Sequence, residues 1–479
     1  MCELTSITER RAYRLAGLSR DAAAPFRKMR EPMTRMSSTD RPDPAFRLVV
    51  TAVAGLMLYS PAAVAEAPAA SMEAALQRIA GTAGVPAAKR AADALWAQPM
   101  DAPVVLHDPS TATSWRADPT TGAALPVVLR KDQPPANTCI DVEGSPHVLL
   151  VLPLPEADDA LSMLFWHEQW HCVQAALGLP ASEGSTAHLD SESGRTWLRL
   201  EMRALALALP AADDPQARQH AAAALAFRAR RAALAAPGTN ALAEEAKLER
   251  NEGLAEYTGR TVAAAGANGN AAAAVAAALV KADATDSFVR SMGYATGPAY
   301  GVLLDRWSPH WRSGLSADTD LPTLLARAIL VDPAAATAEP LGPRYGGNEV
   351  VAEERSRARV REQRSAEHRR RFLGDDAVRL PLRRPSVSFD PRTLFPLDDA
   401  GTVYAPITVR DEWGELKAGS GALLSADWSL VSVTGGAVEG CLASWTGPDW
   451  TLELAEGWRL EQAPRGWRLV EGTPSPCPQ

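Results

Sequence analysis

Two histidines one helical turn apart, with a glutamate beside the first, form the most informative pattern in the chain. His167, Glu168 and His171 have the spacing H-E-x-x-H. An α-helix turns by about 100° per residue, so imidazoles at i and i+4 project from one face and can ligate one ion. Glu168 is then placed to reach a water molecule bound to that ion. The spacing therefore predicts a zinc (Zn2+) site on a helix, with Glu168 as the general base.

A catalytic zinc ion needs a third protein ligand, and the segment 251–257 offers two carboxylates. Glu252 and Glu256 are four residues apart in a stretch of helical composition, so both are expected to face the same way. Because two histidines and one glutamate are a standard ligand set for catalytic zinc, we assign Glu252 as the third ligand. Glu256 is expected to accept a hydrogen bond from His167 or His171 and so to fix the orientation of that imidazole.

The order of these motifs, H-E-x-x-H and then N-E-x-x-x-E, resembles the gluzincin metallopeptidases, which have the thermolysin-like catalytic core. The resemblance covers about residues 161–257 and depends on the five positions His167, Glu168, His171, Glu252 and Glu256. It implies a zinc-dependent peptidase acting on a peptide or protein substrate, with a small sheet leading into the metal-binding helix. The segment between the two motifs is alanine-rich and longer than in thermolysin, so inserted helices could narrow or cover the cleft.

The expected chemistry is hydrolysis of an amide bond. Bound zinc would lower the pKa of its water, and Glu168 would take the proton and return it to the leaving amine. Gluzincins that this chain resembles often stabilise the oxyanion with a tyrosine or histidine from a later helix. The candidates are Tyr294, Tyr300 and His310. Tyr294 is preferred because it precedes a break or kink expected at Pro298.

Two other classes of function are compatible with the same residues. One is a non-catalytic binding protein that keeps a zincin-like fold, and the other is an envelope-associated protein in which the C-terminal region carries the function. Structural zinc sites are usually closed by four cysteine or histidine ligands. Here only three ligands are visible and Glu168 is present, which favours the hydrolase.

The elements that would position the site are predicted from short-range patterns. Valine-rich runs bounded by Pro, Gly, Asp and Ser predict strands at 104–106, 125–129 and 148–152. Periodicity and end signals predict the metal-binding helix at 156–177 and further helices at 196–209, 214–235, 269–281, 286–307 and 349–371. The last of these alternates in charge, which is typical of a solvated helix.

From residue 385 onward the composition becomes rich in Gly, Trp, Thr and Val, with turn residues at short intervals. This pattern predicts a small antiparallel β module. The fold class is therefore expected to be α+β and predominantly helical, with a zincin-like catalytic domain followed by this module. The expected domains are a leader with a signal peptide at 1–65, the catalytic domain at 66–384 and the β module at 385–479.

The N-terminal region has the pattern of an export signal. Arg47 precedes the apolar run 48–59, and the small residues at 63–65 offer a cleavage site, so the mature chain would begin at Glu66. An uncleaved membrane anchor is the alternative. The mature chain would keep 39 basic and 51 acidic residues, a net charge of −12. This charge argues against a nucleic-acid partner, and we expect a periplasmic or secreted protein without a membrane span.

Four cysteines remain in the expected mature chain, Cys139, Cys172, Cys441 and Cys477. An even number in an exported protein permits two disulfides. We favour the pairs Cys139 with Cys172 and Cys441 with Cys477. A free buried thiol is an equally acceptable interpretation of Cys172.

Overall fold

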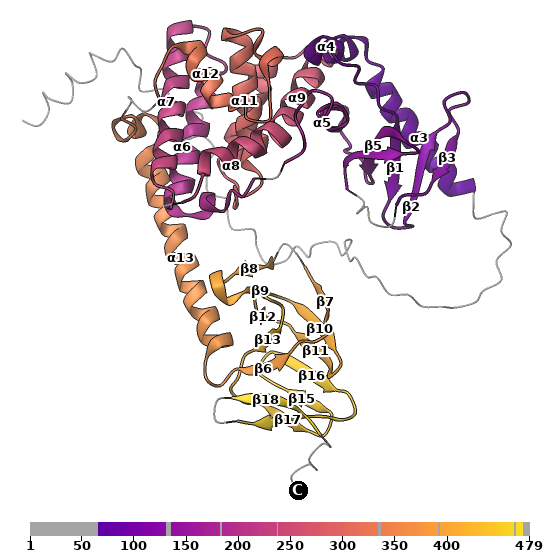
Figure 1. The fold of residues 1–479 in the computed structure, drawn as a ribbon, viewed down its shortest axis with the longest axis vertical. Helices are drawn as coiled ribbons and strands as arrows, with labels where there is room; N and C mark the ends of the chain where they lie inside the picture. The colour runs from indigo at the N-terminus through magenta and orange to yellow at the C-terminus, as the bar shows by residue number, and fades with distance from the viewer. Residues whose placement is uncertain are drawn as a thin grey trace, which may run out of the picture. The chain divides into compact units, whose positions relative to one another are not determined.

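The computed structural model describes residues 66–472 except 131–135, 183, 237, 334–336, 391–392 and 464–465. The expected leader at 1–65 and Cys477 therefore lie outside the described residues. The chain divides into two compact units between Glu354 and Arg355, and each is described by itself. About 48% of the residues are helical and 20% are in strands, which confirms an α+β protein with more helix than strand (Figure 1).

The first unit contains a five-stranded sheet, which follows two helices in the chain. Its strands are β1 (Val104–Asp108), β2 (Thr113–Ala117), β3 (Ala124–Val127), β4 (Thr138–Val142) and β5 (Ser145–Val151). The spatial order is β3-β2-β1-β5-β4, with β1 and β5 parallel and the other pairs antiparallel. The three predicted runs form β1, β3 and β5. Strands β2 and β4 were not predicted, because each is short and mixes polar with apolar residues. Strand β4 lies at one edge of the sheet.

The helices of this unit include the one that carries the H-E-x-x-H motif. They are α3 (Glu66–Ala83), α4 (Pro86–Trp96), α5 (Asp158–Val173), α6 (Glu192–Ala208), α7 (Asp214–Ala233), α8 (Ala241–Leu248), a π-helix (Glu249–Gly253), α9 (Leu254–Gly266), α10 (Ala271–Ala282), α11 (Met292–Trp307), α12 (Leu321–Ile329) and the start of α13 (Gly347–Leu373). Short 3-10 helices lie at Ala187–Asp190, Trp311–Gly314 and Glu339–Tyr345.

Helix α5 carries the H-E-x-x-H motif and ends earlier than expected. Its last α-helical residue is Val173, and Gln174 is its C-cap. The chain then tightens into turns up to Gly178, whose φ of 74° is left-handed, as is common after a helix end. The regular helix thus ends four residues before the predicted residue 177, and Gly178 ends the turns that follow it. This end places Gln174 one turn beyond His171.

Helix α11 differs from its prediction in two respects. It starts at Met292 rather than at residue 286, and it continues through Pro298 without a break. A proline inside a helix removes one backbone hydrogen bond but can be tolerated where neighbouring elements pack tightly. Pro298 is buried, so packing holds the helix together where the sequence predicted an interruption.

The second unit contains two sheets with a shared apolar core. Its strands are β6 (Val378–Pro381), β7 (Ser386–Phe389), β8 (Phe395–Pro396), β9 (Thr402–Tyr404), β10 (Ile407–Asp411), β11 (Gly414–Ala418), β12 (Ala422–Leu424), β13 (Leu430–Val433), β14 (Glu439–Cys441), β15 (Ser444–Thr446), β16 (Trp450–Leu454), β17 (Trp458–Gln462) and β18 (Trp467–Glu471). A 3-10 helix lies at Asp398–Ala400. The six-stranded sheet has the order β14-β15-β16-β11-β10-β7, and the seven-stranded sheet has the order β17-β18-β6-β13-β12-β9-β8.

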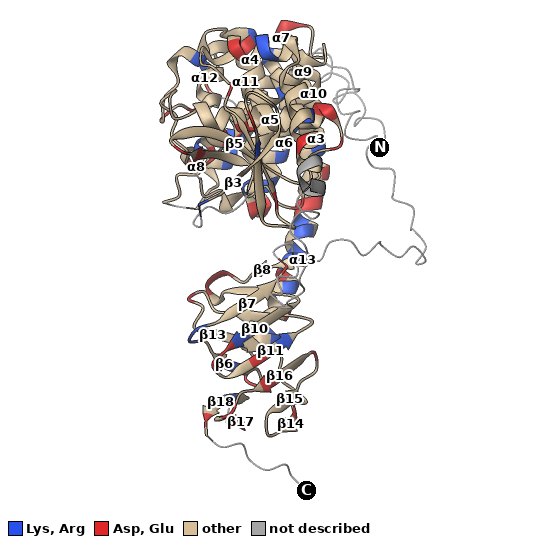
Figure 2. Ribbon diagram, turned by 90° about the vertical axis from the view of Figure 1, so that its right-hand side faces the viewer, with Lys and Arg blue, Asp and Glu red and all other residues tan. Residues whose placement is uncertain are grey.

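These sheets are antiparallel, as expected, except where β18 runs parallel to β6. Strand β6 precedes residue 385, so the β-rich unit includes residues ahead of the predicted module. Helix α13 carries the alternating charge seen in the sequence, and Figure 2 shows both basic and acidic residues along it. No helix in the part of the chain that the structure describes has both the length and the apolar character needed to cross a bilayer.

Candidate metal centre

Helix α5 is held between the edge of the five-stranded sheet and helix α9. The approach of α9 depends on Gly259. A Cβ atom at this position would lie 2.5 Å from the carbonyl oxygen of Met163 and 3.3 Å from the backbone nitrogen of His167. Such distances are too short for a side chain, so glycine allows α9 to pack backbone to backbone against α5. This contact brings Glu252 and Glu256 to the two imidazoles.

Three acceptor atoms converge where the sequence predicted the ion. Nε2 of His167 lies 3.2 Å from Nε2 of His171. Oε2 of Glu252 lies 3.5 Å from the first nitrogen and 3.7 Å from the second. Ligand atoms bound tetrahedrally at typical zinc distances of about 2.0–2.1 Å would lie about 3.4 Å apart. The triangle formed by these three atoms therefore has the size required to hold such an ion.

The hydrogen bonds on the far side of each imidazole fix which nitrogen faces the site. Nδ1 of His167 lies 3.1 Å from Oε2 of Glu256, and Nδ1 of His171 lies 2.7 Å from Oε1 of Gln174. Both partners are acceptors, so we assign the proton of each ring to Nδ1. Each Nε2 then presents a lone pair to the site. Glu256 thus lies within the expected hydrogen-bond distance of His167.

The electrostatics of the site favour a positive charge between these acceptors. Burial would lower the pKa of His167, but hydrogen bonds with Glu252 and Glu256 outweigh it and raise the pKa to about 9. Burial would raise the pKa of Glu252, but hydrogen bonds with both histidines and Tyr294 hold it below its usual range. Without an ion, a proton on His167 supplies the positive charge that a bound cation would otherwise supply.

Glu168 is buried beside the triangle, with 4% of its surface exposed. Its Oε2 atom has no hydrogen-bond partner among the described residues. Burial raises the pKa of this carboxyl group. A buried carboxylate oxygen without a partner is costly and calls for an explanation, and a water molecule on a metal ion would supply the missing donor. His167, Glu168 and His171 also form a possible metal-binding group, with ligand atoms within 4.8 Å of one another.

Of the three candidates for oxyanion stabilisation, the structure brings Tyr294 to the site. Its ring stacks on the His167 ring, with centroids 5.7 Å apart and planes 6° apart. Its hydroxyl donates to Oε2 of Glu252 at 2.5 Å. Tyr300 instead donates to the buried Glu201 at 2.5 Å. His310 caps the 3-10 helix that follows α11, and neither residue is among the contacts of the histidine pair.

The segment that carries Glu252 is a π-helix between α8 and α9, where the sequence predicted regular helix. The amide of Leu254 bonds to the carbonyl of Glu249, which is the i→i+5 pattern of a π-turn. Gly253 lies in this turn against Gly297 of α11, where an added Cβ on Gly297 would lie 2.4 Å from the Gly253 Cα. This close crossing places Tyr294, one turn before Gly297, over Glu252.

A buried ion pair stabilises the start of the π-helix. Glu249 accepts two hydrogen bonds from Arg228, at 2.8 and 3.0 Å, and a third from Thr296 at 2.6 Å. Burial is the main influence on Glu249 and raises its pKa to about 7, although Arg228 opposes the change. Both partners are almost fully buried. Paired buried charges of this kind are costly to separate, so they fix the start of the turn.

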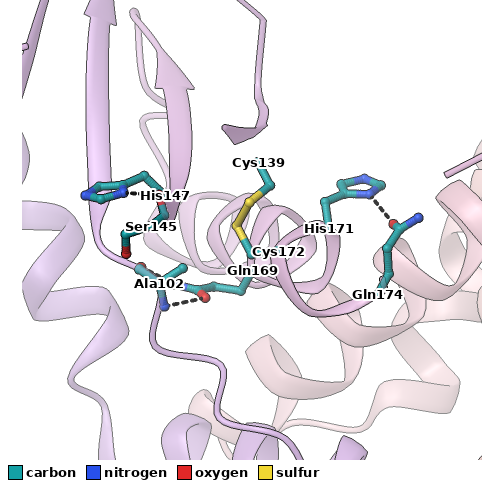
Figure 3. Close-up of a disulfide and its surroundings, with 8 residues drawn as sticks. All are labelled: Ala102, Cys139, Ser145, His147, Gln169, His171, Cys172 and Gln174. Carbon is teal, nitrogen blue, oxygen red and sulfur yellow. Dashed lines mark hydrogen bonds between the residues drawn. A yellow bond between two sulfur atoms is a disulfide. The ribbon is translucent and has the colours of Figure 1, made fainter. Parts of the chain in front are cut away.

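The structure joins Cys139 of β4 to Cys172 of α5, one of the two expected pairs (Figure 3). Cys172 directly follows His171, so this bond ties the edge strand to helix α5. On the same helix, Gln169 bonds to both backbone groups of Ala102, at 2.8 and 3.1 Å. The predicted pair of Cys441 with Cys477 involves a residue outside the described ranges.

Three residues that contact the candidate ligands or their partners were not predicted from the sequence. Arg260 pairs with Oε1 of Glu256 at 2.6 Å. Gln174 accepts a hydrogen bond from His171, and Asn251 donates one to Glu252. A signal was present in the sequence for Arg260 and for Gln174. Arg260 stands four residues after Glu256, and Gln174 stands three residues after His171, so each lies one helical turn from its partner.

No match was found when the chain was compared with models of protein families, with curated proteins and with solved structures. The interpretation of this site therefore depends on its own geometry.

Proposed function

We propose that this protein is a zinc-dependent metallohydrolase of the gluzincin type and that it acts as a peptidase. The observation that carries the proposal is the triangle of acceptor atoms from His167, His171 and Glu252, with sides of 3.2, 3.5 and 3.7 Å. Beside it lies the buried Oε2 atom of Glu168, which lacks a partner among the described residues. Three ligands with a neighbouring carboxylate are typical of catalytic rather than structural zinc sites.

The roles of the side chains follow from their positions. Bound zinc would acidify a water molecule and polarise the scissile carbonyl group. Glu168 would accept the proton of that water at Oε2 and return it to the leaving amine. Its raised pKa suits this exchange, because a carboxylate with a pKa nearer neutrality both takes and releases a proton more readily. Tyr294 would direct its hydroxyl toward the developing oxyanion.

We assign Glu252 rather than Glu168 as the third ligand. Oε2 of Glu252 is nearly equidistant from Nε2 of both imidazoles. Glu252 comes from a different helix, so the three ligand atoms can surround an ion. Glu168 directly follows His167 on the same helix, and successive residues point about 100° apart. This direction suits contact with a bound water better than contact with the ion.

The arrangement of elements and the disulfide support the rest of the proposal. A small sheet leads into the H-E-x-x-H helix, and a later helix supplies the third ligand, as in a zincin-like domain. The bond between Cys139 and Cys172 favours an exported protein, periplasmic or secreted, because disulfides persist mainly in oxidising compartments.

The experiment is metal analysis of the purified protein together with cleavage of a mixed peptide library. We expect one zinc ion per chain in the wild type and in Glu168→Gln, and cleavage only by the wild type. Glu156→Gln is the matched control, because Glu156 is an exposed glutamate just ahead of the same helix. It should cleave like the wild type. Equal cleavage by Glu168→Gln would exclude Glu168 as the base, and bound zinc without any turnover would favour a non-catalytic binding protein.

A further inference from the structure

Two metal ligands from distant helices are joined by two amide side chains. Nδ1 of His171 donates to Oε1 of Gln174 at 2.7 Å. Nε2 of Gln174 donates to Oδ1 of Asn251 at 3.0 Å, and Nδ2 of Asn251 donates to Oε1 of Glu252 at 2.8 Å. His171 and Glu252 face each other across the site at 3.7 Å. The four side chains therefore form a ring that the ion would close.

The direction of hydrogen bonding around this ring is fixed by a backbone group. Nε2 of Gln174 also donates to the carbonyl oxygen of Leu179, at 3.1 Å. A flipped Gln174 amide would bring its oxygen against this carbonyl and against Oδ1 of Asn251, and would present NH2 to His171. Gln174 is 3% exposed, so water cannot easily compensate for lost bonds. The buried amide can thus serve only as acceptor toward His171 and as donor toward Asn251.

This direction determines how both ligands can bind. Because Gln174 offers an acceptor, the proton of His171 stays on Nδ1 and its Nε2 is free for the ion. Because Asn251 donates to Oε1 of Glu252, only Oε2 of that carboxylate faces the imidazoles. His167 differs, since its partner is the ionised Glu256, which is itself paired with Arg260. Only the His171 side of the site is held by neutral amides.

We propose that Gln174 and Asn251 are positioning residues that act as one unit. They keep the proton of His171 on Nδ1, and they restrict Glu252 to binding the ion through one oxygen atom, Oε2. This inference rests on the metal site proposed above. Because each amide orients the next, loss of either one releases both ligands. The affinity for the ion should therefore depend on the intact pair rather than on each residue separately.

The test is a competition titration with Zn2+ on the full chain, comparing the wild type, Gln174→Ala, Asn251→Ala and the double variant. We expect each single variant to bind zinc about 10–100-fold more weakly, as is typical for partners of metal ligands. The double variant should lose hardly more than either single variant. The visible absorption of bound Co2+ should change in the same way in both single variants, which a mere loss of stability would not produce.

Two further variants guard against misfolding. Gln174→Glu keeps the shape and an acceptor for His171 but cannot donate to Leu179 or Asn251, so its affinity should lie between those of the wild type and Gln174→Ala. Gln169→Ala removes another buried amide of α5, one that bonds only to the backbone of Ala102 (Figure 3). It should lower the melting temperature and leave the affinity for zinc within about threefold, since second-sphere losses of 10–100-fold require contact with a ligand.

The outcomes separate the two proposals. A wild type that binds no zinc overturns the proposed function. A wild type that binds zinc, with single variants that bind it equally well, overturns the positioning role alone. Single losses that multiply in the double variant show that the amides act independently, and this also overturns the proposal that they form one unit.

Discussion

Oε2 of Glu252, in the π-helix after α8, lies 3.5 Å from Nε2 of His167 in α5. Two sequence motifs that are far apart along the chain therefore meet at one point. Both atoms are acceptors when His167 carries its proton on Nδ1, toward Glu256. Acceptors held this close repel each other unless a positive charge lies between them. The contact thus indicates a cation site more directly than either motif does alone.

Replacing Tyr294 by Phe should slow the chemical step without weakening substrate binding. The variant keeps the ring that stacks on His167 and loses the hydroxyl that reaches Glu252. If this hydroxyl stabilises the oxyanion, kcat should fall about 10²–10³-fold with little change in KM. Steady-state kinetics of the zinc-loaded protein on its best library peptide measure this. Tyr300→Phe, which removes the buried bond to Glu201, should lower stability but not kcat. Full activity in Tyr294→Phe would exclude the role.

The disulfide should contribute to stability. Cys139 and Cys172 are 33 residues apart in the chain, and a cross-link across a loop of this length restricts the unfolded state. Replacing both by serine should lower the free energy of unfolding by about 2–4 kcal/mol, as measured by urea denaturation. Zinc affinity should fall as well, because Cys172 adjoins His171. An unchanged unfolding midpoint in the double variant would show that the disulfide between β4 and α5 does not stabilise the fold.

Gly297→Ala should disturb the crossing of α11 with the π-helix. The added Cβ would lie 2.4 Å from the Cα of Gly253, so the helices must separate. We expect a loss of about 1–3 kcal/mol in the free energy of unfolding and a weaker affinity for zinc. Gly81→Ala is the control, because this exposed glycine of α3 has open space around it. That variant should be as stable as the wild type or slightly more stable. Equal behaviour of the two variants would contradict the packing argument.

His220 should make the protein sensitive to acid. It is buried, its Nδ1 lies 3.0 Å from the Tyr345 hydroxyl, and burial with the nearby Arg344 lowers its pKa from 6.5 to about 4. As the pH falls below 6.5 the unfolded chain takes up this proton first. The contribution of neutral His220, fully present above pH 6.5, is therefore lost progressively down to about pH 4.

The corresponding measurement is the free energy of unfolding at pH 7 and pH 5 for the wild type and His220→Gln. Glutamine can still accept from Tyr345 but does not titrate in this range. Between the two pH values the wild type should lose about 1–2 kcal/mol more than the variant, which follows from 1.36 kcal/mol per pKa unit. An identical pH dependence would show that His220 is not held neutral in the folded protein.

The parts of the site that can be predicted from the sequence are those set by local spacing. Residues at i and i+4 of a helix share a face wherever the helix lies, so the histidine pair and the two glutamates were found without any knowledge of packing. The pair of Cys139 with Cys172 was favoured from the even number of cysteines, with a free Cys172 thiol as the alternative, and the structure has the disulfide. Strands β1, β3 and β5 were found because their valine-rich runs are bounded by turn residues.

The parts that could not be predicted depend on contacts between elements. The π-turn at Glu252 is held by the Gly253–Gly297 crossing and by the ion pair of Glu249 with Arg228, which lie in three different helices. The sequence places Gln174 one helical turn after His171, but it does not show that the same amide also reaches Asn251. Its role appears only when α5 and the π-helix are brought together. Packing also overrides the usual effect of Pro298, which lies inside a continuous helix.

The central claim is that His167, His171 and Glu252 hold one divalent cation. The most direct measurement is a titration of the metal-free protein with Co2+, read by its visible absorption, for the wild type and Glu252→Ala. We predict one ion per wild-type chain with the intense spectrum of a tetrahedral site, and an affinity lower by at least about 100-fold in Glu252→Ala, since one of three protein ligands is lost. An affinity and spectrum unchanged by this substitution would contradict the claim.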